Sequence, residues 1–139
     1  MKKNAFWIVL VAGLVLVAGC GTEEELSENG DTVNLQPNFD SIHDRLLSQS
    51  CAASGCHGGD EPQNGLGLDQ GRDAVYASLM TSSVQKPELN LVEPGDPTKS
   101  ALYLALTGTG GFQPMPPAGQ IPPADLDAIW DWIEAGAAR

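Results

Sequence analysis

The feature that most constrains this chain is a pair of cysteines, Cys51 and Cys56, with His57 directly after the second. Two thiols can add to the vinyl groups of a porphyrin, and a histidine beside the second thioether is then placed to ligate the iron. The pattern therefore predicts a covalent haem site, although four residues separate the cysteines here instead of the usual C-x-x-C-H spacing. These are small residues, Gly55 among them, and could loop outwards. A small disulfide loop beside an incidental His57 is the alternative.

Residues 1–19 have the layout of an export signal. Lys2 and Lys3 precede an apolar run over residues 5–16, and small residues lead directly into Cys20. This arrangement resembles the signal peptides of bacterial lipoproteins, which implies cleavage before Cys20 and acylation of its thiol and new amino group. An ordinary signal peptide or a short membrane anchor is the alternative, but the run is short for a spanning helix. We therefore expect a protein lipid-anchored to a membrane of the bacterial cell envelope and facing the periplasm.

Export also bears on the cysteines and on the charge. With Cys20 lipidated, Cys51 and Cys56 form an even pair in an oxidising compartment, where haem attachment and a disulfide are both possible. Removing 19 of the 139 residues, Lys2 and Lys3 among them, leaves 120 residues with five basic and 18 acidic side chains, a formal charge of −13. Such acidity argues against binding to nucleic acid or anionic lipid. This acidity favours cationic partners with a basic face, or serves only to solvate the surface.

The rest of the chain has room for a tether and one domain. Residues 20–37 are acidic and polar without apolar periodicity and predict a flexible tether, so the domain is expected over residues 38–139. Periodicity, capping residues and helix breakers predict helices from Asn38 to Gln49, Asp69 to Met80, Asp96 to Gly108, and Pro122 to Gly136. No segment alternates apolar and polar residues long enough to predict a sheet. Long loops rich in Gly and Pro leave little core for about 100 residues, so we expect a large internal ligand.

The predicted helices carry apolar faces. The first places Phe39, Ile42 and Leu46 on one side and leads towards the cysteines. In the last helix the stripe consists of Leu126, Ile129, Trp130 and Ile133. Trp132 lies off this stripe and is expected to give partial surface cover. Asp69 is expected to cap the second helix.

Met115 is the candidate for a second iron ligand. It lies between Pro114 and Pro116, and proline fixes φ and lacks an amide hydrogen, so the segment is stiff and outside any helix. A stiff loop with one soft thioether suits a ligand to iron, whereas a core methionine ordinarily lies on a helix face. Met80 ends a helical stripe and is expected to be ordinary core. His43 borders the first apolar face and is a weaker alternative ligand, because such histidines are usually packed or solvated.

Several segments together carry a family resemblance. In chain order they are Cys51 to His57, Gly65 to Asp69, Val92 to Leu102, Met115 to Pro117, and Trp132 to Ala137. Over residues 39–138 the chain resembles a monohaem class I cytochrome c, and it is most similar to cytochrome domains also attached to larger exported bacterial proteins. The resemblance implies an all-α cytochrome c fold of about four helices around one haem. In that fold the helix from Phe39 crosses the helix that ends at Gly136.

The same resemblance implies one haem c bound through Cys51 and Cys56, with His57 as proximal and Met115 as distal iron ligand. The spacing between the cysteines departs from the family pattern. With both axial positions filled, no open site remains for a substrate, so we expect electron transfer and not an enzyme. Two alternatives remain: a haem enzyme or gas sensor in which Met115 is displaced, and a haem-free lipoprotein that binds another protein through a disulfide-stapled surface.

Overall fold

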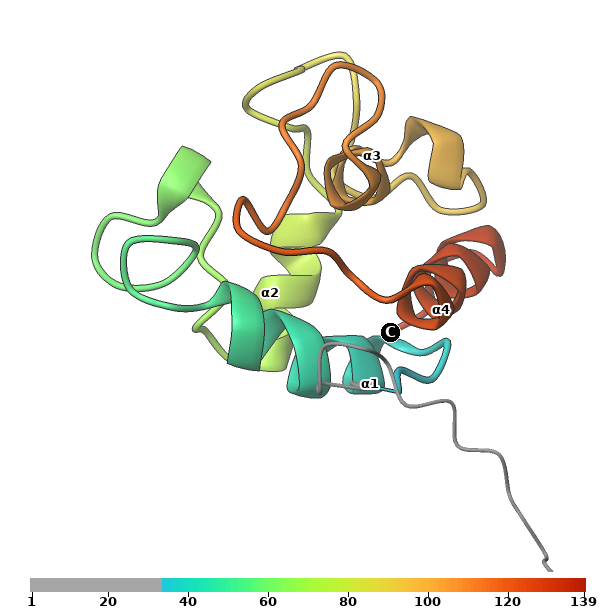
Figure 1. The fold of residues 1–139 in the computed structure, drawn as a ribbon, viewed down its shortest axis with the longest axis horizontal. Helices are drawn as coiled ribbons and strands as arrows, with labels where there is room; N and C mark the ends of the chain where they lie inside the picture. The colour runs from blue at the N-terminus through green and yellow to red at the C-terminus, as the bar shows by residue number, and fades with distance from the viewer. Residues whose placement is uncertain (1–33) are drawn as a thin grey trace, which may run out of the picture.

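The computed structural model describes residues 34–139. The expected signal peptide, Cys20 and most of the tether therefore lie outside the described residues. Within these, the chain forms helices and long loops without a β-sheet (Figure 1). The elements are α1 (Phe39–Ile42), η1 (His43–Cys51), η2 (Gln63–Gly65), α2 (Arg72–Leu79), η3 (Pro97–Lys99), α3 (Ala101–Thr107) and α4 (Pro123–Glu134). This mostly helical architecture is compatible with the expected all-α class.

The first predicted helix is present and extends further, to Cys51. The Asn38 side chain accepts a hydrogen bond from a backbone N–H of the first turn (2.9 Å) and so caps α1. The chain passes directly into η1, a π-helix, at whose end the Ala52 N–H donates to the Leu47 carbonyl (2.9 Å). Hydrogen bonds of a π-helix reach one residue further than those of an α-helix, so the buried face departs from the predicted period. The predicted face of Phe39, Ile42 and Leu46 is buried, as expected, and Leu47 outside it is buried as well.

The packed domain begins before the predicted boundary. Leu35 is buried (5% exposed) in the same core as the helices, and its N–H donates to Oδ1 of Asp125 in α4 (2.8 Å). Asp125 is itself buried, so this bond satisfies a carboxylate that is enclosed by protein. The tether predicted to reach residue 37 therefore ends earlier, and the domain predicted over residues 38–139 also includes Leu35.

α2 begins later than predicted, and Asp69 is not its cap. Gly71 is the residue that precedes the helix. Asp69 instead accepts a hydrogen bond from the N–H of Gly59 (2.8 Å) and so ties down the preceding loop. An acidic residue shortly before an apolar period matches the signature of a cap, so the sequence pattern could not separate these two roles. α2 buries the apolar side chains of Val75 and Leu79.

The helix predicted from Asp96 to Gly108 is divided, because Asp96 caps only the short helix η3 and α3 begins at Ala101. The other predicted end signals of α3 and α4 are confirmed. The Asp96 carboxylate accepts a hydrogen bond from the Thr98 N–H (3.1 Å) at the start of η3. Gly108 ends α3 with a positive φ of 64°, which glycine adopts without strain. Pro123 is the first residue of α4, and Gly136 follows the last turn with φ 99°.

The two tryptophans of α4 exchange their expected roles. Trp132 is buried (2% exposed), its Nε1–H donates to the Ala138 carbonyl (2.9 Å), and its ring lies 5.9 Å from that of Phe39. Trp130 is only half-buried and packs edge-on against Tyr103 at 5.1 Å. α4 packs against α1 on one side and α3 on another, so its apolar face is wider than one stripe. The prediction that Trp132 gives only surface cover is therefore wrong.

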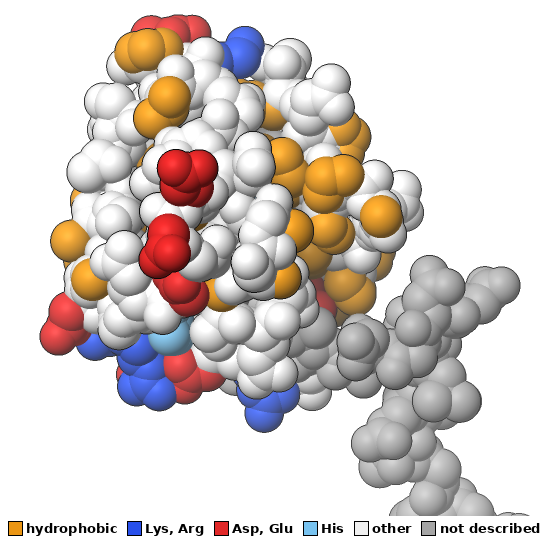
Figure 2. Space-filling model, turned by 90° about the vertical axis from the view of Figure 1, so that its left-hand side faces the viewer, with side chains coloured by type: hydrophobic (Ala, Val, Ile, Leu, Met, Phe, Trp, Pro, Cys, Tyr) orange, Lys and Arg blue, Asp and Glu red, His pale blue; other side chains and the backbone are white. Residues whose placement is uncertain are grey.

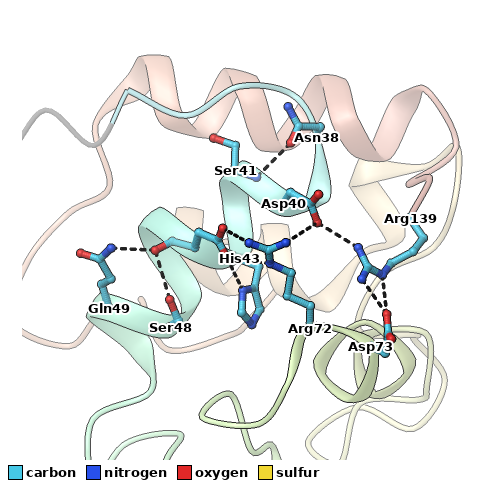
Figure 3. Close-up of polar contacts among 10 residues, drawn as sticks. Asn38, Asp40, Ser41, His43, Ser48, Gln49, Arg72, Asp73 and Arg139 are labelled. Carbon is cyan, nitrogen blue, oxygen red and sulfur yellow. Dashed lines mark hydrogen bonds and ion pairs between the residues drawn. The ribbon is translucent and has the colours of Figure 1, made fainter.

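Exposed ion pairs join the first helix, α2 and the end of the chain (Figure 3). Arg72 donates to Asp44 through Nε (2.9 Å) and Nη2, and its hydrogen bond lowers the pKa of the Asp44 carboxyl. Arg139 donates to Asp40 (2.9 Å) and to Asp73 through Nε (3.0 Å). Exposed pairs contribute little individually. Several pairs on adjoining elements restrict the orientation of the first helix against α2.

Candidate haem site

The segment from Cys51 to His57 is a compact loop at the end of η1. The N–H of His57 donates to the Cys51 carbonyl (3.1 Å), and the N–H of Cys56 donates to the Ala53 carbonyl (2.9 Å). These bonds return the backbone of His57 to Cys51, while residues 53–55 are exposed, as expected if the additional residues loop outwards. Cys51 is half-buried and Cys56 is exposed, and both are free thiols.

The two thiols differ in their surroundings. Burial raises the pKa of the Cys51 thiol from its ordinary value of 9.0 to about 11, with a smaller contribution from the charge of Cys56. Cys51 is therefore a neutral thiol at neutral pH.

His57 is held by its backbone on both sides. Its N–H bonds to Cys51, and its carbonyl accepts from the Leu68 N–H (2.6 Å). The side chain is half-buried, and Nδ1 is enclosed without a hydrogen-bond partner among the described residues. An enclosed Nδ1 leaves Nε2 as the nitrogen suited to ligate iron. Ligating histidines usually donate the other ring N–H to an acceptor, so the free Nδ1 departs from the common arrangement.

Asp69 belongs to this site in a way that the sequence did not reveal. Its carboxylate bonds to the Gly59 N–H, two residues after His57, while the adjacent Leu68 N–H bonds to the His57 carbonyl. Both contacts hold the glycine-rich loop closed behind the histidine. The available signal was the position of Asp69 directly after Leu68, inside one of the segments on which the expected resemblance rests.

Met115 lies in the segment between α3 and α4, which crosses the view of Figure 1 (orange). Its N–H donates to the carbonyl of Ala105 in α3 (2.9 Å). The neighbouring Pro114 packs against Gly108, where a Cβ would lie 2.9 Å from the proline Cγ. The Met115 side chain is half-buried against the core. The backbone of the segment is thus anchored to the end of α3 at Met115.

Met115 and the cysteine loop border one core. The partly buried apolar residues packed against that core include Cys51, Ala52, Leu66, Met80 and Met115. Figure 2 shows hydrophobic side chains (orange) gathered along one side of the face that it draws. Partial exposure of apolar side chains beside polar ligating groups is typical of a binding site. In polarity and in ligand type, these residues fit a haem. Met80 packs against the core, as predicted.

His43 is a buried side chain of η1 (7% exposed). Its Nδ1 lies 2.8 Å from Oδ1 of Asp44, and its ring lies 5.7 Å from that of Phe39. Nε2 is enclosed without a hydrogen-bond partner among the described residues. These contacts are those of a packed histidine, and they explain its burial without a ligating role.

A surface pocket of about 290 Å³ lies between α1 and α4, with Phe39, Trp132 and Arg139 in its lining. None of the predicted haem-site residues lines this pocket. Across residues 34–139 no cluster of three or more His, Cys, Asp or Glu side chains is placed to hold a metal ion. A haem with His and Met ligands needs no such cluster, since the porphyrin supplies the other ligands.

Comparisons with protein-family models, with curated proteins and with solved structures found no match to this chain. In the part of the chain that the structure describes, no helix combines the length and the apolar character needed to cross a bilayer.

Proposed function

We propose that this protein is an electron carrier with one covalent haem c and the cytochrome c fold. Cys51 and Cys56 would each add a thiol across a vinyl group, and His57 and Met115 would ligate the iron. The observation that carries the proposal is the compact loop that joins two free thiols to a half-buried histidine at the edge of a partly exposed apolar core. When bound, the haem supplies one-electron chemistry between Fe(III) and Fe(II).

The chain's own residues would hold and tune this group. The His57 backbone bonds fix the proximal imidazole, and the Ala105 carbonyl anchors Met115. A thioether ligand and a low-polarity surrounding both favour Fe(II), which raises the reduction potential relative to a haem with two histidine ligands. With both axial positions filled by protein, no position is open for a substrate, so we propose a carrier and not an enzyme.

Contacts between the two ends of the domain support the cytochrome c fold. The Phe39 ring of α1 packs on Trp132 of α4 at 5.9 Å, and Leu35 bonds to Asp125 of the same helix (2.8 Å). Contact between the first and last helices is what the family resemblance implies. The two ends of the domain thereby meet on the side of α4 that faces α1. The loops between the helices would then be available to enclose the haem.

A redox titration combined with carbon monoxide tests the function. We expect the purified haem protein to show one reversible one-electron transition, and its ferrous form to bind no carbon monoxide until Met115 is replaced by Ala. Ready binding by the unaltered protein would favour a haem enzyme or gas sensor. Protein without haem and with a Cys51–Cys56 disulfide would favour the haem-free lipoprotein.

We further propose that acylated Cys20 anchors the protein to a membrane of the bacterial cell envelope, facing the periplasm. The sequence before Cys20 supports this, because a basic start, an apolar run and small residues precede the cysteine. A Cys20→Ser variant should lose the lipid and fractionate as soluble protein or as uncleaved precursor. Release of the unaltered protein without detergent would argue against the anchor.

We propose that the redox partner presents a basic face. Figure 2 shows a row of Asp and Glu side chains on the face drawn, with Lys and Arg at its lower edge and at its top. Asp60, Glu61 and Asp69, which follow the haem-binding loop in sequence, are exposed. Opposite charge would then steer the encounter, and the rate of electron transfer should fall as salt rises. Equal salt dependence with cationic and anionic redox reagents would contradict this proposal.

A further inference from the structure

Lys86 lies in a closed turn of the loop between α2 and η3. The Ser83 N–H donates to the Leu89 carbonyl (2.8 Å), and the Leu89 N–H donates to the Lys86 carbonyl (2.9 Å). The Lys86 N–H in turn donates to the Ser83 hydroxyl (3.3 Å). Ser83 is buried, so this turn is fixed to the body of the domain. The backbone of Lys86 is therefore held, and its side chain leaves the turn in a defined direction.

The Lys86 ammonium contacts the segment that carries Met115. Its Nζ lies 5.2 Å from the centre of the Phe112 ring, which is a cation–π distance. A Cβ on Gly111 would lie 3.2 Å from Nζ, so the ammonium also sits against the backbone. Phe112 is buried, and its N–H closes a turn by donating to the Thr109 carbonyl (3.0 Å). The two loops meet at the top of Figure 1.

Lys86 also differs from three other cations of the described domain. Arg72, Lys99 and Arg139 each pair with at least one carboxylate. Lys86 contacts no carboxylate within the described residues, and its ammonium has the Phe112 ring as its partner. The sequence has 18 acidic and only 7 basic residues, so random pairing at the surface would give a lysine a carboxylate partner and not an aromatic ring. The contact links two loops that are otherwise separate in the chain.

We propose that Lys86 is a positioning residue for Met115, an inference that rests on the proposed haem ligation. The turn that ends at Phe112 precedes Met115 by three residues, and the Met115 N–H is held at Ala105 (2.9 Å). With both points fixed, the thioether has little freedom to leave the iron. Without the ammonium, the Phe112 turn is released from the loop of Lys86, so the fraction of molecules with Met115 detached rises.

Imidazole binding to the ferric protein tests this, because imidazole reaches the iron only where Met115 has left it. Lys86→Met removes the charge and keeps an unbranched apolar chain, whereas Lys86→Arg keeps a cation for the ring. Lys99→Met is the matched control, since it removes a positive charge that pairs with Asp96. We expect Lys86→Met to bind imidazole roughly twofold to fivefold more tightly than the unaltered protein. Lys86→Arg and Lys99→Met should match the unaltered protein.

Unchanged imidazole affinity in Lys86→Met would overturn the role of Lys86. If Lys99→Met increased the affinity as much as Lys86→Met, the effect would be one of net charge, and the role of Lys86 would again be overturned. Met115→Ala separates this inference from the proposed function. If Met115→Ala leaves imidazole affinity unchanged, the distal ligand itself is wrong. If it tightens binding more than tenfold while Lys86→Met does nothing, only the positioning role fails. Should Lys86→Met not fold, Phe112→Leu removes the ring, keeps the apolar bulk and carries the same expectation.

Discussion

Gly58 lies so close to Ala52 that a Cβ on the glycine would be 2.0 Å from the Ala52 carbonyl oxygen and 2.8 Å from its carbon. No side chain fits there unless the backbone moves. Ala52 directly follows Cys51 and Gly58 directly follows His57, so this close approach is what allows the loop from Cys51 to His57 to close. The candidate haem site thus depends on a glycine that looks, in the sequence, like any other in a glycine-rich loop.

Gly58→Ala should therefore open the loop. We expect it to destabilise the haem-free protein by roughly 1–3 kcal/mol, because the methyl group must displace the backbone. Covalent haem content should fall with it. Gly71→Ala is the matched control, because Gly71 has an extended backbone (φ −61°) with no atom within 4 Å of an added Cβ. Urea unfolding would measure both, and equal stabilities of the two variants would contradict the expectation.

Trp132 should contribute far more stability than Trp130. Trp132→Ala removes a buried ring and its hydrogen bond to Ala138, and should cost about 3–5 kcal/mol in the free energy of unfolding. Trp130→Ala should cost clearly less, because Trp130 is half-buried and contacts mainly Tyr103. Chemical denaturation of both variants makes the comparison. A larger loss in Trp130→Ala would favour the helix face predicted from periodicity.

The buried Cys51 thiol predicts a loss of stability at alkaline pH. Its pKa is raised from 9.0 to about 11 in the folded protein, so between these values the unfolded chain loses the proton while the folded chain keeps it. The unfolding free energy of the haem-free, reduced protein should therefore fall over this range, relative to Cys51→Ser, which does not titrate there. Below pH 9.0 the difference between the two proteins should be constant. A constant difference up to pH 11 would contradict the burial of this thiol.

Met115 should control the reduction potential. Met115→Ala removes the ligand that favours Fe(II), so the midpoint potential should fall. Met80→Leu and His43→Ala are controls, since Met80 packs on the core and His43 packs on Phe39. Potentiometric titration of the three variants compares them directly. A large shift in His43→Ala with none in Met115→Ala would make His43 the distal ligand instead.

Helix ends and long apolar faces could be predicted from the sequence because local chemistry decides them. The glycine at 108 and the prolines at 122 and 123 act within one turn, and the structure bears out each of them. Asp96 before proline also starts a helix, but only the short η3, and α3 begins separately at Ala101. Leu46 also lies on its predicted face. The residues of the candidate site could be named because thiols, imidazole and thioether have few alternative uses in this arrangement.

Other features depend on tertiary contacts, and local patterns do not record those. The π-helix that ends at Cys51 changes the helical period. The burial of Leu47 could therefore not be predicted from the spacing of three and four residues that apolar side chains have in an α-helix. Trp132 is buried because α1 covers a second side of α4. Asp69 and Leu35 bond to residues that lie elsewhere in the chain, Gly59 and Asp125.

The most direct test of the proposed function is the intact mass of the denatured protein. The full chain would be produced in a bacterial envelope together with a cytochrome maturation system, and compared with a Cys51→Ala, Cys56→Ala double variant. We expect the unaltered polypeptide to carry the mass of one haem after acid and organic solvent have removed any haem that is not covalently bound. The double variant should carry none. Complete extraction of haem from the unaltered protein, or a mass two hydrogens below the haem-free chain from a disulfide, would contradict covalent attachment at Cys51 and Cys56.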